Sequence, residues 1–160
     1  MLEIERKFLV EPPDVLVEPF LSAERWRIEQ TYLKGSLDRR VRHIQIEGNS
    51  SFYYTSKRRL SPLVRQERER RITPPLYQRL LAKADPQRTP LLKTRWRVMN
   101  GGYLWELDLF DRYPGLALLE VELEREGQVA NPPLFFCVIG EVTDDPRYSG
   151  RSLALLESRV

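Results

Sequence analysis

Charged and apolar residues alternate along the first ten residues of the chain. Glu3, Glu5 and Lys7 occupy alternate positions, while Ile4 and its even-numbered neighbours are mostly apolar. Because successive side chains of a β-strand point to opposite faces, this spacing predicts a strand over residues 1–10 with one charged face.

Pairs and triplets of ionic residues two positions apart recur in later strand-like segments. They are Arg40 and Arg42, Glu67 and Glu69, Lys93, Arg95 and Arg97, Glu106 and Asp108, and Glu120 and Glu122. Each set places its charges on one face of its strand, and taken alone each could face solvent on an open sheet. The agreement between segments instead indicates a charged interior. Since buried ions are costly unless they pair or meet a ligand or metal, a binding interior is favoured over a bare structural network.

The alternation and the turn residues predict a mainly β fold of the α+β kind. Strands are expected over residues 1–10, 26–34, 39–46, 52–57, 64–72, 91–99, 103–110, 116–124 and 138–143. Gly, Asn, Asp and Pro separate them. An amphipathic helix is predicted over residues 75–84, where Leu76, Leu80 and Leu81 recur at helical spacing, and a short helix over residues 152–158.

The length of 160 residues suits a single domain over residues 1–160. With about eight antiparallel strands and few helices, the expected architecture is a closed β-barrel whose interior holds one small ligand. The helix over residues 75–84 is expected to plug the barrel or cover its wall. Residues 111–115 are expected to form a loose link between two strands.

Composition narrows the class of protein further. The chain is 41% hydrophobic and 31% charged, and its net charge of +3 would not repel an anionic ligand but does not demand nucleic acid. No signal segment and no apolar run of membrane-spanning length are present, which favours a cytoplasmic protein. The single cysteine, Cys137, lies in the apolar run 134–139, so we expect a buried thiol in a reducing compartment.

Several segments, taken in chain order, match a known family. Residues 3–7 read Glu-Ile-Glu-Arg-Lys, which resembles the ExExK signature of the CYTH domain, the triphosphate tunnel metalloenzyme superfamily. The other segments that resemble blocks of this family are 30–33, 40–42, 55–57, 67–69, 93–95, 105–110, 115–116, 120–122 and 140–148. The sequence departs from the family pattern at Thr31, Gly150 and residues 111–112. None of these departures removes an ionic position, so they affect the expected loop shape and tunnel mouth rather than the expected chemistry.

The resemblance implies a tunnel of antiparallel strands that binds a triphosphate together with a divalent metal. Arginine forks and lysine charges suit phosphate oxygens, so the cationic positions are expected to bind substrate. They are Lys7, Arg40, Arg42, Lys93 and Arg95, with Arg97 as a further candidate. Carboxylates in the same cavity would repel this ligand unless a cation intervened, and their hard oxygens suit Mg²⁺ or Mn²⁺. The expected ligands are Glu3, Glu5 and Glu122 around a substrate-bridging metal, and Glu67, Glu69, Asp108 and Glu120 near a second metal or its waters.

Lys57 and Tyr32 are the candidate catalytic residues. A lysine crowded by cations has a lowered pKa and can act as a general base, and the resemblance pairs such a lysine with a tyrosine at the position of Tyr32. The alternative that Lys57 only binds phosphate stays open. His43 lies out of phase with Arg40 and Arg42, so we interpret it as a wall residue.

The expected activity of this short bacterial type is hydrolysis of inorganic triphosphate to pyrophosphate and phosphate. The sequence offers no group committed to an adenine edge, a ribose or a thiazolium ring, which disfavours thiamine triphosphatase, nucleoside triphosphatase and class IV adenylate cyclase on the same fold. A polyphosphate or nucleic-acid binder without catalysis is the alternative of another class. Arginines at 39–42, 58–59 and 68–71 support it, and the interleaved acids oppose it. The expected partner is a small polyanionic substrate, without nucleic acid or membrane, and a homodimer is left open.

Overall fold

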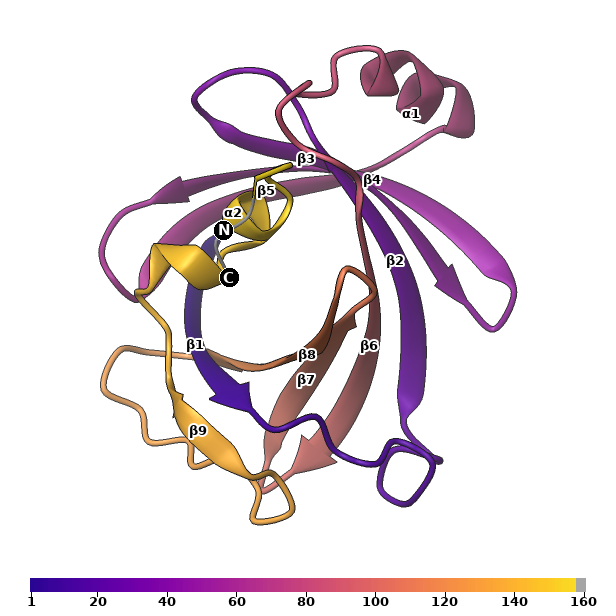
Figure 1. Cartoon of the computed structure of the whole chain (residues 1–160). Coiled ribbons are helices and arrows are strands. Elements are labelled where there is room, and N and C mark those ends of the chain that lie inside the picture. The colour runs from indigo at the N-terminus through magenta and orange to yellow at the C-terminus, as the bar shows by residue number, and fades with distance from the viewer. Residues whose placement is uncertain (158–160) are drawn as a thin grey trace.

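The chain forms one antiparallel sheet of nine strands, eight of which close into a barrel (Figure 1). The computed structural model describes residues 1–157. The strands are β1 (Leu2–Val10), β2 (Glu24–Tyr32), β3 (Asp38–Ile46), β4 (Asn49–Arg59), β5 (Val64–Ile72), β6 (Leu91–Asn100), β7 (Tyr103–Phe110), β8 (Tyr113–Leu123) and β9 (Val138–Glu141). The predicted mainly β, eight-stranded closed barrel is therefore confirmed.

The barrel closes where β1 meets β5. The strands follow the order β5-β4-β3-β2-β6-β7-β8-β1-β9, and the register that joins the two ends pairs Glu3 with Arg65. One edge of β1 is shared, because its first residues pair with β5 and Phe8 to Val10 pair with β9. Between these two pairings, at Glu5 and Lys7, β1 has neither strand as its neighbour on this edge.

The largest apolar core lies on the outer face of the barrel. Trp105 on β7 and Leu119 on β8 are fully buried there, because the β1–β2 and β8–β9 connectors cover them with Phe20 and Phe136. Since successive side chains alternate faces, the ionic residues of the same strands point into the barrel. The strand pattern thus buries apolar surface outside the wall and leaves the interior charged.

The helices are few and short. Helix α1 (Pro74–Leu81) begins after Thr73, whose hydroxyl accepts a hydrogen bond from the Leu76 amide, and it packs on the outside of β3 and β4. The helix covers the barrel wall and does not plug the barrel. It ends at Leu81, three residues before the end of the predicted helix 75–84. No helix within residues 1–157 is long and apolar enough to cross a bilayer.

The C-terminal segment closes one end of the barrel. A 3-10 turn, η1 (Pro146–Tyr148), leads into helix α2 (Gly150–Leu153), which lies over the ring of strands in Figure 1. Leu153 and Ala154 pack there against buried residues such as Tyr32 and Leu118. The predicted helix over 152–158 was therefore placed too late, and residue 158 lies outside the described residues.

Two local predictions are wrong. Cys137 is exposed, because the segment around it lies at the sheet edge, where β9 pairs with β1 and Leu134 and Ile139 face solvent. Residues 111–115 are not a loose link. Strand β8 already begins at Tyr113, after a turn, with a register shift between Leu109 and Phe110.

Candidate active site

The barrel encloses a cavity of about 200 Å³ to which every one of its eight strands contributes. The predicted site residues that line it are Glu3, Glu5, Lys7, Tyr32, Arg40, Arg42, Lys57, Glu67, Glu69, Lys93, Arg95, Asp108 and Glu120. Their alternate spacing along each strand is the reason why they share this face. Glu122 and the further candidate Arg97 are not part of the lining: Glu122 is exposed, and Arg97 pairs with Glu24 and Glu106.

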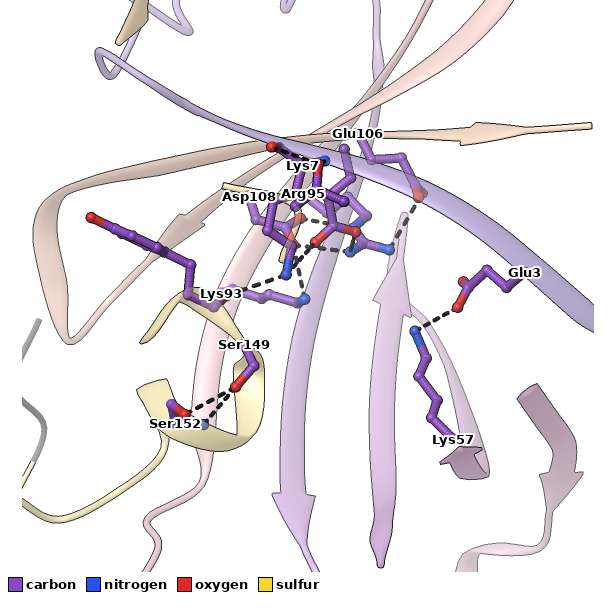
Figure 2. A network of polar contacts seen from close by, with 12 residues as sticks. Glu3, Lys7, Lys57, Lys93, Arg95, Glu106, Asp108, Ser149 and Ser152 are labelled. Carbon is purple, nitrogen blue, oxygen red and sulfur yellow. Dashed lines mark hydrogen bonds and ion pairs between the residues drawn. The ribbon is translucent and has the colours of Figure 1, made fainter. Parts of the chain in front are cut away.

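Asp108 organises the cations of β6. Lys93 donates to its Oδ2 at 2.8 Å, and the Arg95 Nε and Nη2 donate to Oδ1 and Oδ2 at 2.7 and 2.9 Å (Figure 2). Although burial favours the neutral acid, Arg95 and Lys93 hold the pKa of Asp108 well below its ordinary value. The carboxylate is thus committed to two cations, and it fixes the direction in which both point.

Arg95 also contacts carboxylates of β7 and β8. Arg95 lies 3.3 Å from Glu106 and 3.8 Å from Glu120, and Lys7 lies 3.4 Å from the other oxygen of Glu120. Burial lowers the pKa of Lys93 to about 8 in spite of its contact with Asp108. Burial thus opposes the charged form of Lys93, while the ion pair with Asp108 favours it.

Lys57 stands apart from this cluster and is held by acids from two other strands. Its Nζ lies 2.9 Å from Glu3 (Figure 2) and 3.2 Å from Glu67. Burial and Arg40 lower the pKa of Lys57, but Glu5, Glu3 and Glu67 together outweigh them and raise it. The predicted lowering of the Lys57 pKa is wrong, because the three carboxylates outweigh Arg40 and burial.

Tyr32 is fully buried and contacts Arg40. Its hydroxyl oxygen accepts from the Gln30 side-chain amide at 2.8 Å and from Arg40 at 3.4 Å. Arg42 on β3 forms an ion pair with Glu69 on β5. No hydrogen bond among the described residues joins Tyr32 to Lys57, so the structure places the predicted catalytic pair in one cavity without direct contact.

The carboxylates leave a local excess of negative charge. Burial and the neighbouring Glu120 raise the pKa of Glu5 to about 7, and burial and Glu3 raise the pKa of Glu122. Repelling carboxylates with raised pKa values suit an added cation, and their hard oxygens are the donors that Mg²⁺ and Mn²⁺ prefer. Within residues 1–157, however, no three acidic side chains converge closely enough to hold an ion. The donor chemistry of the lining therefore fits a divalent metal, although the described carboxylates do not form one tight cluster.

The interior continues into a second cavity of about 230 Å³ beside the stretch of β1 that lies between its β5 and β9 pairings. Glu5, Lys7, Arg40 and Lys57 line both cavities, and the outer one is bounded by the segment before α2. The charged interior therefore opens toward the C-terminal segment, which gives a polyanion a route to the buried cations.

Sequence reasoning missed several groups in the site, among them Glu106, Gln30 and the Tyr148 carbonyl oxygen. Gln30 donates to Tyr32, and the alternation that placed Gln30 and Tyr32 on one face was the available signal. The Tyr148 carbonyl oxygen accepts from the Lys7 ammonium at 3.2 Å. No sequence pattern could indicate this contact, because it joins the two ends of the chain through a loop.

Comparison with known proteins extends these observations. No family model matches the sequence. An inorganic triphosphatase from Nitrosomonas europaea is 33% identical over 159 residues, which cover 97% of this chain and 98% of that protein. A crystal structure of an inorganic triphosphatase shares 33% identity over 96% of this chain and 94% of that chain, with a TM-score of 0.61. A putative adenylyl cyclase from Hippeastrum, described as having a dominant triphosphatase activity, shares 17% identity over 77% of this chain and 80% of its own, with a TM-score of 0.57, and shows the common fold alone.

Proposed function

This chain belongs to the CYTH superfamily of triphosphate tunnel metalloenzymes, and on that premise we propose that it hydrolyses inorganic triphosphate to pyrophosphate and phosphate. Its likeness to an inorganic triphosphatase spans nearly the whole of both chains. The observation that carries the proposal is the closed barrel whose interior is lined by buried arginine and lysine side chains held in place by carboxylates.

The cations of the cavity would bind the phosphate chain. Guanidinium groups present forked donors to phosphate oxygens, and ammonium groups add point charges. Arg95 and Lys93 are already oriented by Asp108, and Arg40 is oriented by Tyr32, so little side-chain freedom remains to be lost on binding. These residues, with Lys7, Arg42 and Lys57, form the proposed substrate site.

Hydrolysis breaks the bond between the terminal phosphorus and the oxygen of the leaving pyrophosphate, while water attacks that phosphorus in line. Negative charge spreads over the equatorial and leaving oxygens, so fixed cations stabilise the transition state without covalent chemistry. Lys57, held protonated by its acidic neighbours, would act here as a cation rather than as a base. Tyr32 would keep Arg40 directed into the cavity.

The carboxylates Glu3, Glu5, Glu67 and Glu120 would hold Mg²⁺ or Mn²⁺ once substrate is present, with Glu122 reaching in from the rim. When bound, the metal would neutralise phosphate oxygens and withdraw electron density from the reacting phosphorus. Lys57 pairs with both Glu3 and Glu67, so these two carboxylates would be shared between the ammonium and the metal. The cytoplasmic location and the homodimer stay predictions.

A phosphate-release assay with tripolyphosphate, ATP and thiamine triphosphate at matched metal concentration tests the proposal. We expect the highest specificity constant for tripolyphosphate, because the lining offers charge to both ends of a bare anion, and a nucleoside removes charge from one end. An equal or higher value for either organic triphosphate would overturn the substrate assignment. The Arg95→Gln variant should lose activity, whereas Arg125→Gln, an exposed arginine outside the cavity, should not.

A further inference from the structure

A groove lies outside the barrel, between α1 and the wall formed by β3 and β4, at the top of Figure 1. Its volume is about 440 Å³. It is lined by Leu33, Lys34, Arg39, Tyr54, Arg70, Leu76, Leu80 and Lys83. None of these residues lines the tunnel cavity, so the groove is a separate site on the opposite side of the wall.

One side of the groove is apolar. Leu76 and Leu80 lie four residues apart on one face of α1, both half-buried, and Leu33 at the end of β2 is buried beneath them. Tyr54 adds an aromatic ring, and the Arg70 guanidinium lies 5.5 Å from the centre of that ring. This surface offers an apolar body a wall of leucine and tyrosine carbon atoms.

The other side carries positive charge that the protein leaves uncompensated. Four of the eight lining residues are cations and none is an acid. None of these four cations forms an ion pair with another residue among residues 1–157. Arg39 is fixed by a hydrogen bond of 2.7 Å to the Lys34 carbonyl oxygen, and its Nε is buried without a partner. The tunnel cations, in contrast, are paired with carboxylates.

We propose that this groove binds a small amphipathic anion, with an aliphatic or aromatic body against the leucines and a carboxylate or phosphate head group at the cations. The volume falls within the range of about 300–1,000 Å³ that is typical of small-molecule pockets. A leucine wall facing unpaired cations matches both halves of such a ligand. A nucleic acid would use the charge but not the leucines, so the small amphiphile is the better match.

Calorimetric titration with octanoate and with octyl phosphate tests this proposal and identifies the head group. We expect at least one of them to bind at a single site. Octanol, which keeps the body without the charge, and acetate, which keeps the charge without the body, should bind at least about tenfold more weakly. Octanol binding as tightly as octanoate and octyl phosphate, or no binding of either anion, would overturn the proposal.

Two exposed cations allow the site to be located without disturbing the fold. The double variant Lys83→Gln and Arg70→Gln should weaken binding about tenfold, because both lining charges are lost. The matched control is Arg79→Gln, which removes an exposed arginine of α1 that does not line the groove and should leave binding unchanged. Equal affinity in the double variant and the wild type would refute the site. So would displacement of the bound amphiphile by a short single-stranded RNA that binds more tightly.

Discussion

Gly150 lies against Tyr32 so closely that a β-carbon at position 150 would stand 2.4 Å from the tyrosine hydroxyl oxygen. It would also stand 2.8 Å from the Gln30 side-chain nitrogen, which donates to that hydroxyl. Tyr32 is buried and cannot easily move away. The absence of a side chain at position 150 therefore lets α2 close the barrel end directly over the tyrosine.

We predict that Gly150→Ala destabilises the fold by about 1–3 kcal/mol, since an added methyl group in a packed site forces neighbours to shift. Turnover should fall as well, because either α2 or the Tyr32 hydroxyl must leave its position. Urea unfolding and phosphate release measure the two effects. Gly115→Ala is the control, because a β-carbon there meets no atom within 4 Å. Identical behaviour of the two variants would disprove the proposed contact.

Lys57→Gln is expected to raise KM for tripolyphosphate more than it lowers kcat. The ammonium is held protonated by Glu3 and Glu67, so its loss removes a phosphate-binding charge rather than a base. Lys57→Arg should retain more affinity than Lys57→Gln, because it keeps the charge. Steady-state kinetics of both variants check this, with Arg125→Gln, which removes an exposed cation that lines neither the cavity nor the groove, as control. A fall in kcat at unchanged KM would instead support the base role.

Glu5 should make the metal-free protein less stable as the pH rises. Burial and Glu120 raise its pKa from 4.5 in the unfolded chain to about 7 in the folded protein. Between these values the folded state binds more protons, so the free energy of unfolding falls with rising pH, by no more than about 3 kcal/mol. Urea unfolding of the wild type and Glu5→Gln in EDTA, at about pH 5.5 and pH 8, measures this. The free energy of unfolding of Glu5→Gln relative to that of the wild type should be higher at about pH 8 than at about pH 5.5. A relative free energy that does not change with pH would contradict the prediction.

Removal of divalent metal is expected to abolish hydrolysis, and either Mg²⁺ or Mn²⁺ should restore it. Glu5→Gln should bind metal more weakly in a calorimetric titration with Mn²⁺ and tripolyphosphate, because the amide keeps the shape but loses the charge. Glu122→Gln should show a smaller loss, since its side chain is exposed and does not line the cavity. The exposed Glu126→Gln serves as control. Full activity in EDTA would rule out the proposed metal dependence.

Cys137 should react with a thiol-specific reagent in the folded protein. The residue is exposed beside β9, and the neighbouring Glu11 raises the pKa of its thiol, so the rate should increase with pH above neutrality. Labelling with and without urea measures the difference. Strong protection of the folded protein would mean that the segment is covered.

The alternation of residues along each strand could be read from the sequence because it depends on neighbours only two positions away. Glu3 and Glu5 on β1, or Lys93 and Arg95 on β6, must share a face wherever the strand lies. The number of strands therefore indicated the barrel, and the repeated ionic pairs indicated most of the residues that line its cavity. Glu122 departs from this pattern because it lies further along β8, where its side chain is exposed.

The contacts that set the chemistry depend on which strands meet when the barrel closes. Lys57 on β4 is flanked by Glu67 on β5 and by Glu3 on β1, and β1 reaches β5 only through the closing pairing. Its raised pKa could not be deduced from the sequence, because Arg40 on β3, Glu3 and Glu5 on β1 and Glu67 on β5 come from strands that are distant in the chain. The exposure of Cys137 likewise depends on the position of β9 at the sheet edge. Local spacing determined which side chains enter the tunnel, and only the tertiary structure decided their partners, because electrostatic interactions depend on distances across the barrel.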